Sequence, residues 1–355
     1  MTQRMAAEFS PRIEYEIVST RYPAPHAEWD RMTFREKLDE KLLGGSSIRN
    51  VVDKFVPDLV YSDSPQYATQ FKLLSLLSRK RVPLVLHLRG DVWREHWAAF
   101  ASASTARRIL SIQQHSYDWT SVALSTTVTP ICRWLQTVIT HHIPRKRCEV
   151  VYQGIDPKQF DPEVQKQPTF EVQKPAIAIL QNHSVFPKVQ GLINFRKAVE
   201  KLPRVHFYIA EGEAWAQSFL SVVKEHYARV SNVHFVKGIT SADEVSRMIT
   251  ACDCYVLASG LDCCPTTVLE ASLLQKPVLA SRVGGVPEII EDGVTGWSVD
   301  NEDINSWVSR IETILQDPRL SRRLGSQGRQ WVSEKFGWET IAPQVERLII
   351  REAER

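Results

Sequence analysis

Two carboxylates eight residues apart, Asp262 and Glu270, flank a proline in the stretch DCCPTTVLEA, residues 262–271. The apolar run CYVLAS just before them predicts a buried strand, and Pro265 is typical of the first position of a helix. This loop and helix would then lie at the carboxyl edge of a sheet, which is where α/β proteins bind their ligands.

The residue types in this stretch suit a particular kind of ligand. The unpaired N–H groups of Thr266 and Thr267, at the positive end of the helix, suit a phosphate. Glu270 lies one turn below Thr266, and its carboxylate can accept hydrogen bonds from both hydroxyls of a diol. Asp262 can reach a second polyol, so the spacing suits a phosphate between two sugars. The same spacing of two acids also occurs by chance, and an ordinary loop acid and helix acid remain the alternative.

Four cysteines lie in and before this stretch, and they raise the question of a metal or a redox pair. Cys252 and Cys254 are predicted to share one face of a strand, whereas Cys263 and Cys264 are contiguous. Structural zinc sites favour two C-x-x-C knuckles, which this pattern does not supply. We therefore expect packing thiols and no metal, with a redox switch as the lesser alternative.

The bulk composition predicts a globular protein of two domains. The chain has 355 residues, of which 43% are hydrophobic and 24% charged, and it exceeds the roughly 150 residues usual for one domain. Short apolar runs alternate with amphipathic stretches nearly throughout. This alternation favours an α/β fold with parallel sheets and helices on both faces.

The back half reads as one complete doubly wound domain. Its predicted strands cover residues 176–180, 205–210, 233–238, 254–259, 277–281 and 296–300. Between them the stretches LINFRKAVEKL, ADEVSRMITAC and VLEASLLQ have the three- and four-residue periodicity of helices.

The front half is also α/β but shorter. Its predicted strands cover residues 13–19, 58–64, 82–88 and 121–126, with a helix in SSIRNVVDKFV, and a polar, proline-bearing segment follows at 153–175. The opening residues MTQRMAAEFS read as the tail of a helix, so the first βα unit of a doubly wound domain is expected to be absent.

The text around the two acids resembles the signature of the family 4 glycosyltransferases, also called glycosyl transferases group 1. The shared pattern is an acid, seven residues and Glu, then K-P-V, G-G-x-P-E and G-x-x-G, matched here by DCCPTTVLEASLLQKPVLASRVGGVPEIIEDGVTGW. VVYQGIDPKQFDP resembles the family's interdomain segment, and VHFVKGITSADEVSRMITACDCYVLAS its nucleobase-binding stretch. FGWE resembles the start of its closing helix.

This resemblance implies the GT-B architecture, in which two doubly wound Rossmann-like domains face a cleft. The domains would be an acceptor-binding domain at 1–152, a linker at 153–175, a donor-binding domain at 176–335 and a C-terminal helix at 336–355 that crosses back to the first domain. The family's first βα unit carries a Gly-rich turn, and GGSS (44–47) follows no predicted strand.

Carried over by position, the resemblance implies a role for each part of the signature. Glu270 would hold the ribose of the nucleotide and Asp262 the hydroxyls of the transferred sugar. The backbone at Pro265, Thr266 and Thr267 would contact sugar or phosphate, and Gly238 and Ile239 would border the base. The family often has Glu, Gly and an aromatic residue where this chain has Asp262, Cys263 and Cys264, so we expect a different donor preference.

The resemblance also implies a diphosphate pair. Lys188 matches the family's lysine, and His183 stands where an arginine is usual. A cation aimed at the leaving diphosphate lowers the barrier as charge develops there. His183 could help only when protonated or as a hydrogen-bond donor, which would make the rate pH-dependent near neutrality. For Lys188 the alternative is an ordinary surface lysine.

In the front half, VLHLRGD places His87, Arg89 and Asp91 at the end of a predicted strand. The family has a histidine near the reacting sugar carbon at a comparable point, so His87 is the catalytic candidate. A structural histidine is the alternative. The family's retaining mechanism lets the leaving phosphate deprotonate the acceptor, and we nominate no protein nucleophile.

The predicted function is retaining transfer of a hexose from a nucleotide-diphosphate sugar to a glycan or lipid-linked acceptor, as in polysaccharide biosynthesis, with no cofactor and no metal. The missing Gly-rich unit leaves open a catalytically weak nucleotide-sugar-binding protein. An epimerase of the same fold would lack this signature.

Charge and hydropathy narrow the partners. Residues 1–150 carry 21 basic against 15 acidic residues, with clusters at 79–81, 107–108 and 145–147 that could face phosphates or an anionic membrane. Nothing resembles a nucleic-acid platform. The N-terminus lacks the apolar segment of a secretory signal, so a cytoplasmic protein, peripheral at the inner membrane face, is expected.

Overall fold

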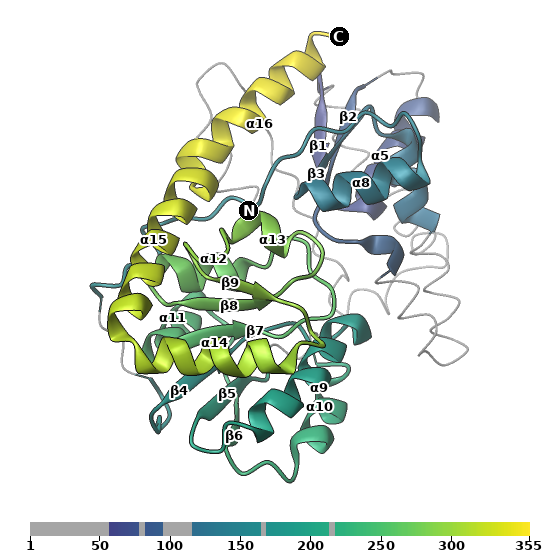
Figure 1. Cartoon of the computed structure of the whole chain (residues 1–355). Helices are drawn as coiled ribbons and strands as arrows, with labels where there is room; N and C mark the ends of the chain where they lie inside the picture. The colour runs from purple at the N-terminus through teal and green to yellow at the C-terminus, as the bar shows by residue number, and fades with distance from the viewer. Residues whose placement is uncertain (1–56, 78–81, 95–115, 165–167, 213–216) are drawn as a thin grey trace.

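The computed structural model contains two parallel sheets that belong to the two halves of the chain (Figure 1). It describes residues 57–77, 82–94, 116–164, 168–212 and 217–355. The first sheet has strand order β1-β2-β3 and the second β6-β5-β4-β7-β8-β9. The predicted alternation of strands and helices is therefore confirmed over these residues.

The second sheet carries all six strands predicted for the back half. They are β4 (Ala176–Ile179), β5 (His206–Ala210), β6 (Val233–Val236), β7 (Cys254–Leu257), β8 (Val278–Ser281) and β9 (Trp297–Val299). The chain order reverses between β4 and β7, which is the doubly wound arrangement. The carboxyl ends of these two strands therefore frame the crevice in which such a sheet binds ligands.

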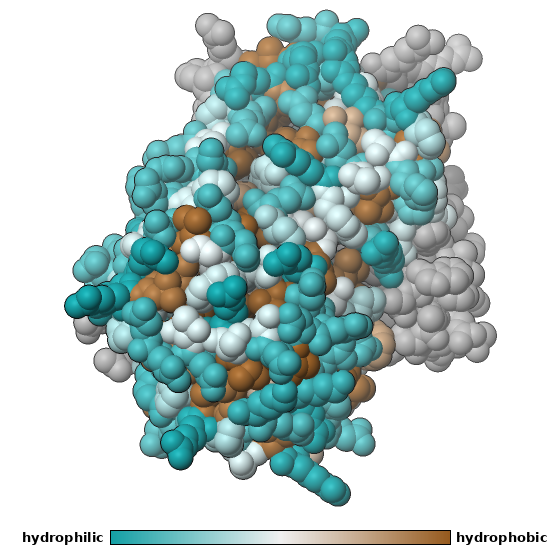
Figure 2. Space-filling view, in the orientation of Figure 1, coloured by the Kyte–Doolittle hydropathy of each residue, from teal (hydrophilic) through white to brown (hydrophobic). Residues whose placement is uncertain are grey.

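Helices cover both faces of this sheet because its strands are apolar on both sides. The helices are α9 (Phe186–Glu200), α10 (Leu220–Tyr227), α11 (Ala242–Ala251), α12 (Thr266–Leu273), α13 (Val286–Ile289) and α14 (Ile304–Gln316). Ile177 and Ile179 of β4 share a cluster with residues of α9, α10 and α14. Ala176 and Ala178 belong to the cluster on the opposite face, with α11 and α12. The face of the molecule that is visible in Figure 2 carries mostly hydrophilic residues.

The first sheet is smaller and carries two of the predicted strands. It consists of β1 (Val60–Ser62), β2 (Leu84–Leu88) and β3 (Thr127–Pro130), with helices α5 (Pro65–Leu77) and α8 (Arg133–His142). The strand predicted at 121–126 is wrong, because residues 116–124 are helical and the strand begins at Thr127. A short apolar run such as SVAL does not distinguish a buried strand from a buried helix end.

Several predictions fall outside the described residues. They are the strand at 13–19, the helix at 46–56, the GGSS segment at 44–47, the absent first βα unit and the basic clusters at 79–81 and 107–108. The predicted linker 153–175 is without a named helix or strand where it is described, apart from an isolated bridge between Ile155 and Gly337.

The last two helices run from the second sheet to the first. α15 (Pro318–Phe336) packs on α12, and α16 (Trp338–Ala353) runs up toward the first sheet (Figure 1). Near its end Glu352 is fully buried. Its carboxylate accepts a hydrogen bond from the Thr127 hydroxyl (3.0 Å) and pairs with Arg147 (3.0 Å). The end of α16 is thereby held against β3.

Two members of the basic cluster at 145–147 serve this internal packing, whereas Arg145 is exposed. Arg147 pairs with Glu352, and the Lys146 ammonium donates to the carbonyls of Ala123 and Ser125. Burial lowers the pKa of Lys146 to about 8. That this cluster faces phosphates or an anionic membrane stays a prediction. Among the described residues, no helix is long and apolar enough to cross a membrane.

Replacing Glu352 by Ala should lower the free energy of unfolding by about 1–3 kcal/mol, because Thr127 and Arg147 lose a buried charged partner. Glu352→Gln keeps an acceptor for Thr127 and should cost less. Urea denaturation measures both. The exposed neighbour Glu354 provides the control Glu354→Gln, and equal midpoints for all variants would contradict this role of Glu352.

Candidate active site

The candidate site lies where β4 and β7 end, at the reversal of strand order in the second sheet. The segment after β4 leads into α9, and the segment after β7 leads through Asp262 into α12. These segments are in close contact. A Cβ on Gly191 of α9 would lie 2.3 Å from the carbonyl carbon of Ser259, so only glycine allows the helix to approach this loop so closely.

Asp262 is held in a loop that has little freedom. The Cys263 N–H donates to its Oδ1 (3.0 Å), and its carbonyl accepts from the Gly285 N–H (3.1 Å). Burial raises the pKa of the Asp262 carboxyl, and the charge of Lys188 opposes this rise. The two predicted donor-site residues Asp262 and Lys188 are therefore close enough to interact electrostatically.

The two glycines of the G-G-x-P-E segment pack directly on this loop. A Cβ on Gly284, whose φ is +52°, would lie 1.9 Å from the Asp262 carbonyl oxygen. A Cβ on Gly285 would lie 2.1 Å from the Cys263 carbonyl oxygen and 2.6 Å from Cys132 Sγ. Side chains at these two positions would push the loop away. Because both positions are glycine, Cys132 of the first half of the chain can pack close to the Asp262 loop of the second half.

Glu270 lies in the second turn of α12 with its Oε2 buried and without a hydrogen-bond partner among the described residues. Burial raises the pKa of this carboxyl to about 7. A buried acceptor without a donor costs free energy in the folded state. The side chain is therefore suited to a ligand that brings hydroxyl donors, as a ribose diol does.

The first turn of α12 is anchored to the sheet by a buried tyrosine. α12 begins at Thr266, with Pro265 at the preceding N-cap position, so the prediction of Pro265 as the first helical residue is wrong by one position. Tyr255 of β7 donates from its hydroxyl to the Leu180 carbonyl (2.8 Å) and is hydrogen-bonded to Thr267 Oγ1 (2.6 Å). Thr266 is exposed, and the free N–H groups of this turn lie at the positive end of the helix.

Two more unpartnered polar atoms lie after β4. They are Oε1 of Gln181 and Nδ1 of His183, both buried and without a partner among the described residues. His183 Nε2 lies 2.9 Å from the Ala210 carbonyl, so this nitrogen donates and Nδ1 carries the lone pair. Burial lowers the pKa of His183 below its usual 6.5. Near neutral pH the imidazole is therefore an uncharged acceptor at Nδ1, and it does not supply the cation that the resemblance places here.

Gly238 and Ile239, predicted to border the base, follow β6, which is two strands away from β4. Gly238 is exposed with φ +78°, and no atom lies within 4 Å of the point where its Cβ would be. Ile239 is buried in the cluster that also contains Leu269 of α12. The open space beside Gly238 is therefore compatible with a flat ring.

His87 lies inside β2 and is fully buried. Its Nδ1 is hydrogen-bonded to Thr129 Oγ1 (3.1 Å), its ring stacks on Tyr61 with centroids 5.9 Å apart, and its Nε2 has no partner in the described part of the chain. Burial, assisted by Arg89, lowers its pKa to about 3. His87 is thus a neutral imidazole, which can accept or donate a hydrogen bond but carries no charge.

The cysteines form no metal cluster in the described residues, where no group of three or more His, Cys, Asp or Glu could hold an ion. Cys252 and Cys254 do not share a face, contrary to prediction, because Cys252 is the C-cap of α11 and precedes the strand. The two side chains belong to opposite clusters. Burial raises the pKa of Cys252 and Cys264 to about 12, so these thiols stay protonated and serve the packing.

Glu288, for which the sequence predicted no role, joins the two halves of the chain at this site. Glu288 of α13 accepts from the backbone N–H groups of Arg133 and Trp134 (2.8 Å each) and from the Tyr152 hydroxyl (2.9 Å). It thereby caps the N-terminus of α8. Glu288 is the Glu of the G-G-x-P-E pattern in the sequence, but that pattern does not indicate which helix the carboxylate contacts.

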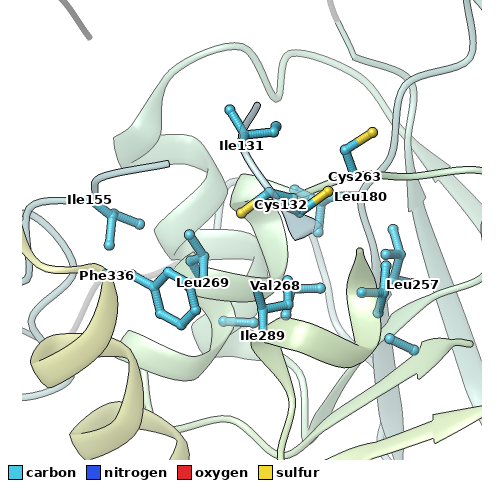
Figure 3. Packing of buried hydrophobic residues seen from close by; sticks show 14 of the residues in the cluster. Ile131, Cys132, Ile155, Leu180, Leu257, Cys263, Val268, Leu269, Ile289 and Phe336 are labelled. Atoms are coloured by element: carbon cyan, nitrogen blue, oxygen red, sulfur yellow. The ribbon is translucent and has the colours of Figure 1, made fainter. Parts of the chain in front are cut away.

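The apolar residues below this contact form one core across both halves. Ile131 and Cys132, between β3 and α8, belong to the same cluster as Leu180, Cys263 and Val268 of the second half (Figure 3). The carboxyl ends of β2 and β3 are therefore held against the loop that carries Asp262. A ligand in the crevice of the second sheet would face the first sheet.

Sequence comparison with known proteins finds a family and several relatives that this chain resembles. Residues 165–331 match the family described as glycosyl transferases group 1. The chain is 32% identical over 124 residues to a GDP-mannose-dependent alpha-(1-6)-phosphatidylinositol monomannoside mannosyltransferase of Mycolicibacterium smegmatis, covering 33% of this chain and 32% of the relative. It is 25% identical over 219 residues to N-acetyl-alpha-D-glucosaminyl L-malate synthase of Bacillus anthracis, covering 59% and 55%. The chain thus spans less than two thirds of either relative.

Solved structures share the fold over most of the chain. Sucrose-phosphate synthase of Thermosynechococcus elongatus superposes with a TM-score of 0.69 at 18% identity, covering 90% of this chain and 80% of that one. The Anabaena HepE protein in complex with UDP and glucose superposes with a TM-score of 0.67 at 19% identity, covering 90% and 84%. These similarities show the predicted GT-B fold. Residues 165–331, a little under half of the chain, are thus similar to the glycosyl transferases group 1 family, and the two facing sheets share the fold of the solved structures.

Proposed function

We propose that the protein is a retaining glycosyltransferase that moves a sugar from a nucleoside-diphosphate sugar to a glycan or lipid-linked acceptor. The observation that supports this most is the loop and helix after β7, where Asp262 and the unpartnered Glu270 flank the N-terminus of α12 at the crevice of the sheet. In chain order, Asp262, the N-terminus of α12 and Glu270 would then match the sugar, the phosphate and the ribose of the donor. The assignment also agrees with the named activities of the family members.

The donor would be held mainly by the second half of the chain. Glu270 would accept hydrogen bonds from the ribose hydroxyls and Asp262 from hydroxyls of the transferred sugar. The first turn of α12 would face the diphosphate with the backbone of Thr266 and Thr267. Gly238 and Ile239 would border the base, since the space beside Gly238 is open among the described residues.

Transfer would break the bond between the sugar carbon C1 and the β-phosphate oxygen. Negative charge develops on the leaving diphosphate, and the ammonium of Lys188 would stabilise it. The acceptor oxygen would attack C1 and pass its proton to the departing phosphate, so no protein nucleophile is required. His183 would contribute a neutral acceptor, because burial keeps its imidazole uncharged.

The principal test is donor binding to Glu270 variants. Glu270→Ala should weaken binding of UDP-glucose or GDP-mannose about tenfold to a hundredfold, since a charged hydrogen-bond acceptor is lost. Calorimetry measures the dissociation constants. Glu312→Gln on the exposed side of α14 is the control, and full donor affinity with full turnover in Glu270→Ala would reject the proposal. Donor binding without turnover in the wild type would favour the weak nucleotide-sugar-binding protein.

The raised pKa of Glu270 predicts a pH dependence of its own. The ionised carboxylate accepts two hydroxyls, so donor affinity should rise between about pH 6 and pH 8 as the group titrates near its pKa of about 7. The ligand-free protein should lose stability as pH rises from the ordinary 4.5 toward 7, because the folded state binds the proton more tightly than the unfolded state. Glu270→Gln should remove both slopes, and unchanged slopes would contradict the assignment.

Lys188 should matter for turnover more than for binding. Lys188→Met should lower kcat about a hundredfold, because charge on the leaving group is no longer stabilised, and Lys188→Arg should recover part of it. Release of nucleoside diphosphate reports the rate. Lys197→Met, an exposed position on the same helix, should retain wild-type kcat. Equal rates for the two methionine variants would exclude Lys188 from the reaction.

Glu288 should act as a positioning residue. Glu288→Gln weakens the link between α13 and α8 and should lower kcat about tenfold or more through misplacement of the two halves, with the donor dissociation constant little changed. Glu291→Gln, exposed and three residues on, is the matched control. If kcat and donor affinity fell together, Glu288 would act by supporting the second sheet and not by aligning the two.

A further inference from the structure

Three arginines follow the carboxyl ends of neighbouring strands in the first sheet. Arg89 and Arg94 follow β2, and Arg133 follows β3. The two segments start side by side, because Leu88 pairs with Pro130 and the Ile131 N–H donates to the Leu88 carbonyl (3.1 Å). This edge of the first sheet is the one that faces the candidate donor site.

Arg94 is held in place by two contacts. Its Nε lies 3.4 Å from Oδ2 of Asp91, a fully buried carboxylate, and its guanidinium carbon lies 5.5 Å from the ring centroid of Trp134. The side chain is nevertheless 65% exposed. Asp91 and Trp134 therefore orient the guanidinium of a largely exposed side chain, which forms no ion pair with any other described residue.

Arg89 and Arg133 are exposed, and neither forms an ion pair with another described residue. Arg89 nevertheless acts on its surroundings, since its charge helps to lower the pKa of His87. The exposed acid Asp63 follows β1, and β1 pairs with β2 on the side opposite to β3. Asp63 therefore follows a different strand from the three arginines. Arg89, Arg94 and Arg133, which follow β2 and β3, thus form a cationic edge beside the indole ring of Trp134, and the Glu288 carboxylate accepts from the backbone N–H groups of Arg133 and Trp134 at the same edge.

The indole ring connects this edge to the donor loop. A Cβ on Gly284 would lie 3.6 Å from Trp134 and 1.9 Å from the Asp262 carbonyl oxygen. Trp134 therefore lies against the loop that would hold the transferred sugar. A molecule bound by Arg94 next to Trp134 would be beside that sugar.

We propose that Arg89, Arg94, Arg133 and Trp134 bind an anionic acceptor, a hydroxyl compound that carries a phosphate or carboxylate near the hydroxyl to be glycosylated. The proposal rests on the proposed function. The planar guanidinium groups match the oxygens of a phosphate or carboxylate, and Trp134, whose ring Arg94 overlies, holds one of them close to the Asp262 loop. In the reaction the acceptor oxygen forms the new bond to C1, its proton leaves with the nucleoside diphosphate, and the anionic group stays unchanged.

The test compares anionic probes with their neutral counterparts. Calorimetry with the full chain and UDP would measure binding of myo-inositol 1-phosphate and sn-glycerol 1-phosphate against myo-inositol and glycerol. The anionic probes should bind about tenfold more tightly or better, as charged hydrogen bonds imply. Equal binding of both classes, including no binding of either, would overturn the proposal. UDP binding measured alone shows independently whether the donor site exists.

Variants of Arg94 locate the site. Arg94→Gln should remove about tenfold of the preference for the anionic probes, and Arg94→Lys, which keeps the charge but not the planar fork, should remove part of it. Arg322→Gln, exposed on α15, is the matched control. An unchanged preference in Arg94→Gln would refute the assignment of this edge.

A second experiment shows whether the anionic group belongs to a lipid headgroup or to a soluble molecule. Sedimentation with phosphatidylcholine vesicles, with and without phosphatidylinositol, shows whether the phosphate belongs to a lipid headgroup. Binding that requires phosphatidylinositol and is lost in Arg94→Gln supports the proposal with a lipid acceptor. Binding of the soluble phosphates alone supports it with a soluble acceptor, and vesicle binding that Arg94→Gln leaves intact counts against this edge.

Discussion

The contact between Glu288 and the N-terminus of α8 is the interaction on which the candidate site depends. It joins the two halves of the chain through three hydrogen bonds of 2.8 to 2.9 Å. The pairing of a carboxylate with a helix N-terminus is favourable in both charge and geometry. Because Gly284 and Gly285 precede Glu288 in the chain and pack on the Asp262 loop, the same short segment sets the position of the Asp262 loop and of the facing sheet.

The second requirement is that polar groups stay unpaired in the site. Glu270 Oε2, Gln181 Oε1 and His183 Nδ1 are buried without partners among the described residues, and each such atom costs stability in the ligand-free protein. Proteins retain such costs at functional sites. The raised pKa of Glu270 has the same origin, since burial without a donor disfavours the charge. A donor that brings hydroxyls would relieve this cost.

The C-terminal helix solves a different problem, which is how two separate sheets remain aligned. α16 begins beside the second sheet and ends against the first, where Glu352 accepts from Thr127 and pairs with Arg147. Two separate contacts between the halves, Glu288 beside the candidate site and Glu352 near the end of α16, limit how the halves can turn. Arg147 and Lys146 show that a run of basic residues need not form a surface for phosphates or membranes.

The sequence by itself determined the six strands of the second sheet, because each is a short apolar run bounded by turns and buried on both faces. It also placed Asp262, Glu270 and the start of α12 together, since spacing along one loop and helix is a local property. Two local predictions failed where local pattern is ambiguous: residues 121–126 are mainly the end of a helix, and Cys252 ends α11 instead of lying in β7. The tertiary structure alone decided that Glu288 caps α8, that His183 is an uncharged acceptor, and that Trp134 lies beside the Asp262 loop with Arg94 over its ring. Each of these depends on side chains far apart in the chain and on burial, which no sequence interval encodes.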